Sequence, residues 1–407
     1  MDKPRNSKIS KSNLIVIKLL SNPRLRGLLV AFRLKRVLRS PISIKKLNYQ
    51  FSYDKTVSNF DLIYSKRILT FLLKNINDIS KPSKQTDASP WAAIVASQSE
   101  LIRIVKSKNA HALAEYLLEA PKNNILTGVL QGKSEYEQLK ISSKYRKVQG
   151  KILLQRLLRL ANAIGTGTDQ NPEQGSWGIR NPENFDQLYN NLYKTFGPEI
   201  EIPDFFSGLF RIKFGSTHWN QVELMSMNSA HQIKNLLDGD TSKVILEIGA
   251  GIGYTTFWLK KLGFELIAII DLPHVIAAQA FFLMKAFPEC RIYLHGESQW
   301  NNDYDIAIFP NSVPLEHLPL SPNLIFNQDS FAEMSTLTIN HLLKSISKFS
   351  DSLLYSINHE SEATYDESAR SQMNIAKVIS QKEHFRLRSR VPNWIREGYV
   401  DQIWEIL

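Results

Sequence analysis

The sequence has very little cysteine and no long apolar run. Cys290 is the single cysteine among 407 residues, so no intramolecular disulfide can form and the chain fits a reducing cytosol. No run of 18 apolar residues occurs, which argues against a transmembrane helix. The N-terminal apolar stretch is interrupted by Lys18 and lacks a small-residue cleavage site, so we expect no secretory signal. These absences predict a cytoplasmic protein.

Acidic side chains are nearly missing from the first 50 residues. These residues hold 13 Lys or Arg and one acid, a net charge of +12 in a chain whose total is +11. Within them, Leu25, Leu28, Leu29 and Phe32 follow a helical spacing. A basic amphipathic helix binds anionic membranes, at about 1 kcal/mol for each basic residue. We therefore expect residues 1–46 to contact a membrane peripherally. The alternatives are an arm that docks on a partner, one that packs on the protein itself or stays solvated, and one that binds nucleic acid.

The two halves of the chain differ in their hydrophobic pattern. Helical spacing recurs up to residue 164, and no alternating strand pattern precedes about residue 208. Beyond it, short apolar runs alternate with helical segments, which predicts a parallel sheet with helices on both faces. We divide the chain into a basic arm (1–50), an all-helical domain (51–207) and an α/β, Rossmann-like domain (208–407). The expected helical segments are 56–77, 91–106, 111–118 and 136–164, and the expected strands are 244–248, 266–271, 291–295, 305–309, 323–327, 352–357, 385–391 and 400–406.

Three glycines at alternate positions follow the first strand of the second half. Residues 244–253 read Val-Ile-Leu-Glu-Ile-Gly-Ala-Gly-Ile-Gly, and a helical pattern begins directly afterwards. A glycine turn between a strand and a helix lets the backbone approach a ligand closely. The spacing E-x-G-x-G-x-G resembles motif I of the Rossmann-like methyltransferases that use S-adenosylmethionine (SAM). The resemblance implies that SAM is held by Glu247, Gly249, Ala250, Gly251 and Gly253, with the acidic side chain suited to the cationic end of the ligand.

A second acidic residue, Asp271, ends the next apolar run, 20 residues after Gly251. Such a residue at the tip of the second strand holds ribose hydroxyls in nucleotide-binding sheets. We therefore expect Asp271 and the adjoining Leu272 in the cofactor site, together with Asn327 at a later strand end. Strand ends on one edge of the sheet form a single crevice, which should contain Glu247, Gly249, Asp271, Pro310, Asn327, Asp329 and Asn358.

A further block of the sequence narrows the family. Residues 327–334 read Asn-Gln-Asp-Ser-Phe-Ala-Glu-Met and resemble the N-x-x-S-F-x-E-M signature of the sugar O-methyltransferases found in bacterial polysaccharide gene clusters. Asp271-Leu272-Pro273 is also typical of that family. Asn171–Gly175 and the segment with Trp91 and Gln98 resemble its N-terminal region. The similarity covers roughly residues 85–407 and implies a SAM-dependent enzyme with a sugar or glycan acceptor.

Methyl transfer to a sugar hydroxyl is helped by a group that accepts the hydroxyl proton. The candidates are Asp329, Glu333 and His359, all near strand ends. Asp329 and Glu333 are four residues apart at an expected helix start, so they could share one face. Each of these two carboxylates also fits a helix-capping role. His359 also fits a solvated loop.

The sequence therefore predicts an O-methyltransferase that acts on a sugar hydroxyl of a bacterial glycan or its precursor. Three aromatic residues could stack on sugar rings, although a core position is their commoner role: Trp219, Trp394 and Tyr399. The alternative functions are a methyltransferase that tailors a lipid or polyketide, and a non-catalytic scaffold in a polysaccharide-synthesis complex. No nucleic-acid partner is expected, because an Asn-Pro-Pro-Tyr-like motif is missing and the body of the chain is near neutral. No metal site is predicted either, since no His/Asp cluster has ligand spacing.

Overall fold

The computed structural model describes residues 48–80, 90–166, 185–197, 200–214, 217–301, 303–364 and 371–407. Residues 1–46, expected to contact a membrane, and Asn171–Gly175 lie outside the described residues. Within the described part of the chain, no helix is long and apolar enough to cross a membrane.

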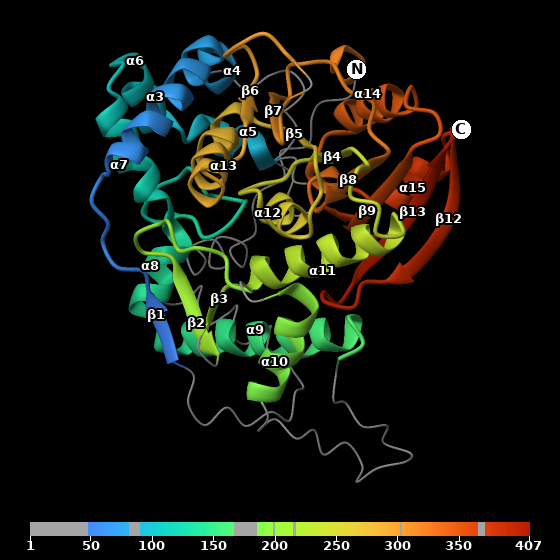
Figure 1. Cartoon of the computed structure of the whole chain (residues 1–407), viewed down its shortest axis with the longest axis horizontal. Helices are drawn as coiled ribbons and strands as arrows, with labels where there is room; N and C mark the ends of the chain where they lie inside the picture. The colour runs from blue at the N-terminus through green and yellow to red at the C-terminus, as the bar shows by residue number, and fades with distance from the viewer. Residues whose placement is uncertain are drawn as a thin grey trace, which may run out of the picture.

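The centre of the molecule is an eight-stranded sheet with the order β12-β13-β9-β8-β4-β5-β7-β6 (Figure 1). Six of its strands, from β6 across to β9, are parallel, and β13 runs antiparallel to both β9 and β12. The strands are β4 (Ile245–Ile248), β5 (Ile267–Asp271), β6 (Ile292–Leu294), β7 (Ile306–Pro310), β8 (Leu324–Gln328), β9 (Leu353–His359), β12 (Phe385–Pro392) and β13 (Tyr399–Ile406).

The chain reverses its direction of travel across the sheet at β4. From β4 it passes to β5 and β7 on one side and then returns to β8 and β9 on the other. When the short edge strand β6, which precedes β7 in the chain, is set aside, β7-β5-β4-β8-β9 reproduces the 3-2-1-4-5 arrangement of the doubly wound Rossmann fold. Ligands bind such sheets beyond the carboxyl ends of the strands at this switch point, so the fold places the expected glycine turn where a site is anticipated.

All eight strands expected from the second half are confirmed. The continuous apolar runs arise because central parallel strands are covered on both faces: all residues of β4, β5 and β7 are buried. Alternate side chains enter two different cores. Ile245 and Ile267 belong to one core, and Leu246 and Ala268 belong to the other.

Helices cover both faces of the sheet. The first core contains residues of α11, α12 and α13, and the second contains residues of α14 and α15. Asn220 caps α11 and forms a capping box with Glu223, and Pro273 stands in the first turn of α13, where proline costs no hydrogen bond. The helices are α11 (Gln221–Leu236), α12 (Tyr254–Lys261), α13 (Pro273–Ala286), α14 (Thr336–Ile346) and α15 (Ile375–Ser380).

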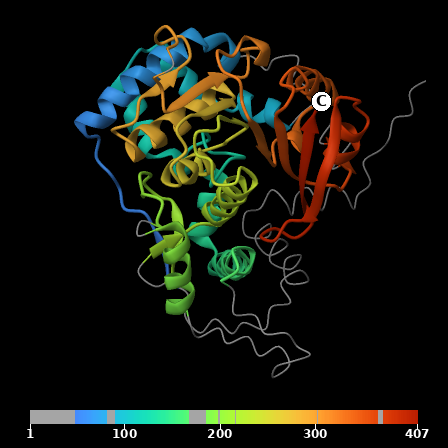
Figure 2. The ribbon, with the colours of Figure 1, turned by 45° about the vertical axis from the view of Figure 1, so that its right-hand side comes forward.

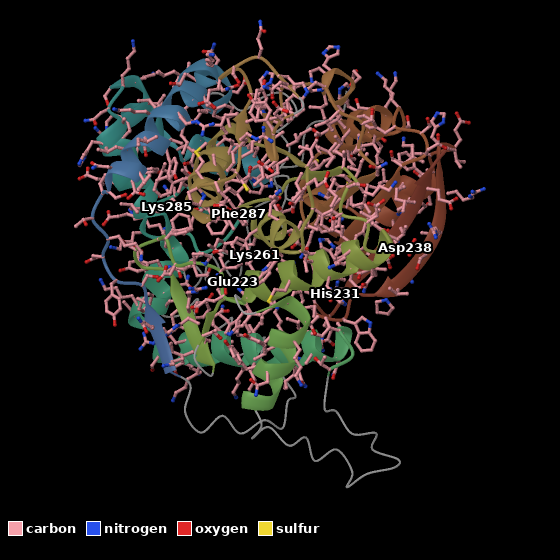
Figure 3. The ribbon with its side chains drawn as sticks, in the orientation of Figure 1. Glu223, His231, Asp238, Lys261, Lys285 and Phe287 are labelled. Atoms are coloured by element: carbon pink, nitrogen blue, oxygen red, sulfur yellow. The ribbon has the colours of Figure 1, made fainter. Side chains whose placement is uncertain are left out.

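The N-terminal half supplies a further layer of helices on the α13 side. Asp61 of α3 forms an ion pair with Lys285 of α13, and Lys285 is labelled in Figure 3. The same core holds Ile68 and Ile245. The elements are α3 (Asn59–Lys74), α4 (Ile76–Ser80), α5 (Pro90–Ala96), α6 (Ser99–Lys106), α7 (Ala110–Leu118), η1 (Ala120–Lys122), α8 (Lys133–Ile141), α9 (Ser143–Ala163) and α10 (Phe185–Phe196).

The expected helical segments are present, but several are interrupted. The segment 136–164 is divided by Ser142, which is extended and caps α9 with its side chain. The expected segments 56–77 and 91–106 are likewise each formed by two helices. Serine favours caps over helix interiors because its hydroxyl binds nearby backbone groups, which explains the break at Ser142.

The expectation that no strand precedes about residue 208 is wrong. Asn48–Phe51 form β1, which pairs antiparallel with β2 (Phe210–Phe214), and β2 pairs with β3 (Thr217–Trp219) (Figure 2). Four residues are too few to show a clear alternation, and the partner strand lies far along the sequence. The small two-stranded pair β10 (Ala363–Thr364) and β11 (Ser371–Gln372) completes the strands of the described residues.

Candidate active site

A cavity of about 560 Å³ opens at the carboxyl edge of the sheet. Residues from the glycine turn, from the segment after β8, from α11 and from the N-terminal helices line it. Nine of the eleven predicted site residues are among them: Glu247, Gly249, Ala250, Gly251, Asp271, Leu272, Asp329, Glu333 and His359. Most of the predicted cofactor-binding residues and all three candidate bases therefore line the same cavity.

The three glycines all have left-handed backbones but different surroundings. Gly249 has φ +72°, and a Cβ there would stand 2.2 Å from Oγ of Ser330. Gly251 has φ +59°, and its Cβ would reach Val129 at 3.4 Å. Gly253 does not line the cavity: its Cβ would meet Leu283 of α13 at 3.2 Å. Only the first two glycines therefore shape the cavity wall, whereas Gly253 allows two helices to pack.

Asp271 stabilises the glycine turn by hydrogen bonds to the backbone. Its Oδ2 accepts a hydrogen bond of 2.9 Å from the backbone N–H of Gly251, and its Oδ1 accepts one of 2.7 Å from that of Leu272. Burial raises the pKa of Asp271 to about 7, although these hydrogen bonds oppose the shift. Each carboxylate oxygen has a second lone pair, so the side chain retains capacity for ligand hydroxyls.

Glu247 is buried at the end of β4. Its Oε2 accepts a 2.8 Å hydrogen bond from the hydroxyl of Thr256. Burial raises the pKa of Glu247 to about 8, and the nearby Asp271 contributes to the rise. A buried carboxyl that holds its proton at neutral pH would ionise when a cation enters the cavity, because opposite charge favours the charged form.

Asn327 does not line the cavity, although it lies directly behind it. Its Nδ2 donates a 2.9 Å hydrogen bond to the carbonyl of Ile248, and its Oδ1 accepts one of 3.0 Å from Asn358. These bonds join the ends of β4, β8 and β9. The crevice prediction therefore needs correction at Asn327, Asn358 and Pro310, which support the wall; Asn311 lines the cavity beside Pro310.

Asp329 and Glu333 are not at a helix start, contrary to expectation. Asp329 stands in a turn with φ +68°, its backbone N–H bonds to the carbonyl of Ile357, and its carboxylate forms an ion pair with Arg396. Glu333 ends a short 3₁₀ helix, η3 (Phe331–Glu333). The following helix, α14, is capped by Ser335. Neither carboxylate serves as a cap, because Ser330 and Ser335 occupy the capping positions. Aspartate is also a common turn residue.

Glu333 has an environment suited to proton transfer. Its Oε2 accepts a 2.9 Å hydrogen bond from the indole Nε1 of Trp91 on α5. Burial raises the pKa of Glu333 to about 7, while the bond from Trp91 opposes the rise. A carboxylate with a pKa near the working pH is well matched to general-base chemistry.

His359 is half-buried at the end of β9 and is not a solvated loop residue. Its Nδ1 lies 3.1 Å from the hydroxyl of Ser361. Burial lowers its pKa, and the charge of Asp329 partly opposes that change. The imidazole also lies edge-on to Tyr399, with ring centroids 5.6 Å apart. His359 is therefore disposed to remain neutral at the cavity wall.

Two arginines of the cavity were missed by sequence reasoning. Arg156 comes from α9, and Arg396 comes from the turn before β13, where its guanidinium lies 3.7 Å over the ring of Tyr399. Neither arginine belongs to a local motif. Of the three aromatic candidates for sugar stacking, Tyr399 lines the cavity, Trp219 is buried in the core and Trp394 is exposed.

Metal ligands do not converge in the part of the chain that the structure describes. No group of three or more His, Cys, Asp or Glu side chains there could hold an ion.

Comparison with known proteins adds little to this geometry. No protein-family profile and no curated protein matches the chain. Among solved structures, it is similar to the glycopeptide N-methyltransferase MtfA in complex with SAM, at 14% identity over 45% of this chain and 94% of that chain, with a TM-score of 0.34. It is also similar to the magnesium protoporphyrin IX methyltransferase of Synechocystis PCC 6803 with bound SAM, at 14% identity over 45% and 81% of the two chains, with a TM-score of 0.29. Likeness of this extent carries no argument about activity. The Rossmann-like fold stands on the strand order and register.

Proposed function

We propose that the chain is a SAM-dependent O-methyltransferase that methylates a sugar hydroxyl of a bacterial glycan or its precursor. One observation carries the proposal. The turn with Gly249 and Gly251, supported by Asp271, opens into the same cavity as Glu333. A cofactor cradle and a group able to accept a proton thus face a common space, as methyl transfer to a hydroxyl requires.

The residues of the cradle fit SAM. Gly249 and Gly251 leave the turn without side chains, so a ligand can lie against the backbone. Asp271 offers carboxylate lone pairs to a ribose diol, and Glu247 offers a charge for a cation. When bound, SAM supplies an electrophilic methyl group, and its sulfur keeps the electron pair of the broken C–S bond.

Glu333 is the base that the environment favours among the three candidates. It would take the proton of the acceptor hydroxyl as the oxygen forms its bond to the methyl carbon. Asp329 is already paired with Arg396, which makes its lone pairs less available. His359, which also lines the cavity, is the alternative base.

The cavity lining is mixed: its charged side chains support a sugar acceptor, whereas its larger apolar part, which includes Met225 and Leu342, suits a lipid or polyketide acceptor. Charged side chains from several elements line it, among them Arg156, Glu333 and Arg396. The N-x-x-S-F-x-E-M block also has a role here: Asn327 and Ser330 support the glycine turn, and Glu333 faces the cavity. These positions explain why such a block would accompany this chemistry.

We also propose that residues 1–46 bring the enzyme to the cytoplasmic face of a membrane, where glycans are assembled on lipid carriers. The support is the charge of the first 50 residues, +12 in a chain of +11. Basic segments are attracted to anionic lipid headgroups at such a surface.

The proposed function is tested by comparing intact-glycan masses from cells with and without the gene. The glycan should become lighter by one CH₂ for every methyl group lost, and the wild-type gene should restore it. Expression of Glu333→Gln separates the enzyme from the scaffold alternative. A scaffold would restore the mass with this variant, whereas an enzyme that uses Glu333 would not.

A further inference from the structure

Arg156 presents a guanidinium to the cavity without a carboxylate partner among the described residues. It lies on α9, and its side-chain hydrogen bond runs from Nη1 to the carbonyl of Gln221 at 3.4 Å. Arg159, one turn further along the same helix, behaves differently: its guanidinium lies 3.7 Å from the carboxylate of Glu397. The charge of Arg156 is therefore available to a molecule in the cavity.

No ion pair joins Arg156 to an acidic side chain among the described residues, although the charge of Asp329 acts on it. Asp329 forms its ion pair with Arg396, and Glu333 is bonded to Trp91 with a pKa raised to about 7. Burial and the charge of Arg396 lower the pKa of Arg156 to about 10, so the guanidinium stays protonated at neutral pH. Arg156 is half-buried, so its charge is only partly solvated, and an anionic ligand would compensate for the lost hydration.

The place of Arg156 separates it from the cofactor cradle. The charged and titratable groups that act on it are Arg396, Asp329, Tyr399 and Arg159. None of them belongs to the glycine turn or to the strand end that carries Asp271. Arg156 therefore faces the part of the cavity that Asp329, Arg396 and Tyr399 line, rather than the glycine turn.

We infer that the acceptor carries an anionic group, a carboxylate or a phosphate attached to the sugar, and that Arg156 binds this group. The inference rests on the proposed function and names its substrate class. Guanidinium groups bind both anions through paired N–H donors. Arg156 would thus select acidic or phosphorylated sugars over neutral ones and fix their orientation.

The test is calorimetric titration of the full-length protein saturated with S-adenosylhomocysteine. The three probes are glucuronate, which carries a carboxylate, glucose 1-phosphate, which carries a phosphate, and glucose, which is neutral. We expect at least one anionic probe to bind roughly tenfold or more tightly than glucose. Arg156→Met should abolish that preference, and Arg156→Lys should keep part of it because the charge remains.

Arg159→Met is the matched control, since it removes the same charge from the same helix outside the cavity lining. It should leave the preference unchanged. The inference is overturned if neither anion binds, if glucose binds equally well, or if folded Arg156→Met keeps the preference. It is also overturned if Arg156→Met loses S-adenosylhomocysteine affinity while it still melts cooperatively, because Arg156 would then serve the cofactor.

Affinity for S-adenosylhomocysteine in the wild-type protein is measured first. It distinguishes failure of the proposed methyltransferase function from failure of the inferred anionic acceptor. Its absence would defeat the proposed function and this inference together. Its presence without an anion preference would defeat this inference alone. If Arg156→Met does not fold, the wild-type comparison of the three probes tests the anion preference, and an unchanged preference in Arg156→Lys would count against binding by the guanidinium.

Discussion

The indole of Trp91 donates a 2.9 Å hydrogen bond to the carboxylate of Glu333. This contact joins α5 of the N-terminal half to the segment after β8. Trp91 also lies near the buried His274, with ring centroids 6.3 Å apart. The helical half therefore contributes directly to the environment of the proposed base and does more than cover the sheet.

Trp91→Phe should raise the pKa of Glu333, because the indole N–H stabilises the ionised form. If Glu333 is the base, the rate increases with pH as the carboxyl loses its proton. The midpoint of this rise should move upward by about one pH unit, given the strength of a hydrogen bond to a charged group. The measurement is the pH profile of kcat. Trp394→Phe, an exposed tryptophan outside the cavity, should leave the midpoint in place, and an unmoved midpoint in Trp91→Phe would count against the bond's role.

Glu333→Gln should bind SAM normally and turn over roughly a hundredfold or more slowly. The amide keeps the size of the side chain but cannot take the proton. Steady-state kinetics and SAM titration on the same preparation give both quantities. Glu397→Gln, at an exposed position, is the matched control.

Asp329→Asn tests the neighbouring carboxylate. Asparagine tolerates the left-handed backbone of this position, so the turn should persist while the ion pair with Arg396 is lost. Unchanged turnover in both Glu333→Gln and Asp329→Asn would move the proton to His359 or to solvent.

SAM should bind more tightly at alkaline than at acidic pH. Burial raises the pKa of Glu247 to about 8, so the ligand-free protein holds this proton at neutral pH, whereas a cationic ligand favours the ionised form. Apparent affinity scales with the competent fraction, and it should therefore increase by roughly tenfold or more from pH 6 to 8.5. Calorimetry at the two pH values measures this change. Glu247→Gln should weaken the dependence, and a flat wild-type profile would be inconsistent with a titrating Glu247 in the site.

Deletion of residues 1–46 should abolish sedimentation with anionic liposomes and leave SAM affinity intact. The truncation keeps β1, which begins at Asn48 and pairs with β2. Binding of the full chain should weaken with added salt, because exposed charges are screened beyond about 8 Å at physiological ionic strength. Neutral liposomes serve as the control. Equal sedimentation of both forms would defeat the membrane proposal, and an insoluble truncated protein would show that the arm packs on the body of the chain.

The sheet could be predicted because its central strands are buried on both faces and thus read as continuous apolar runs. The cofactor turn could be predicted because Glu247, the glycines and Asp271 are close together in the sequence or at a fixed spacing. Their roles are less uniform than the motif suggests, since Gly253 packs against α13 and Asn327 binds the backbone behind the cavity.

The arginines of the cavity could not be predicted in the same way. Arg156 and Arg396 reach it from a helix and a turn far apart in the sequence, and an isolated arginine has no periodicity that marks it. Asp329 was misplaced because aspartate followed by serine fits a helix cap and a turn equally well. The hydrogen bond to Ile357 and the ion pair with Arg396 stabilise Asp329 in the turn.

Calorimetric titration of SAM into the wild-type protein, Gly251→Val and Asp271→Ala shows whether the glycine turn and Asp271 bind this cofactor. Wild-type protein should bind one SAM for each chain. Gly251→Val should lose binding, because valine fills the cradle and resists φ +59°. Asp271→Ala should lose about 1.5–3 kcal/mol, the cost of removing a charged hydrogen-bond acceptor. Gly239→Val is the matched control, since Gly239 also has a left-handed backbone, at φ +78°, but has open space around it.

Gly239→Val should keep wild-type affinity, whereas Gly251→Val and Asp271→Ala should not. Absence of SAM binding in the wild-type protein, or wild-type affinity in Gly251→Val, would show that this turn is not a SAM site.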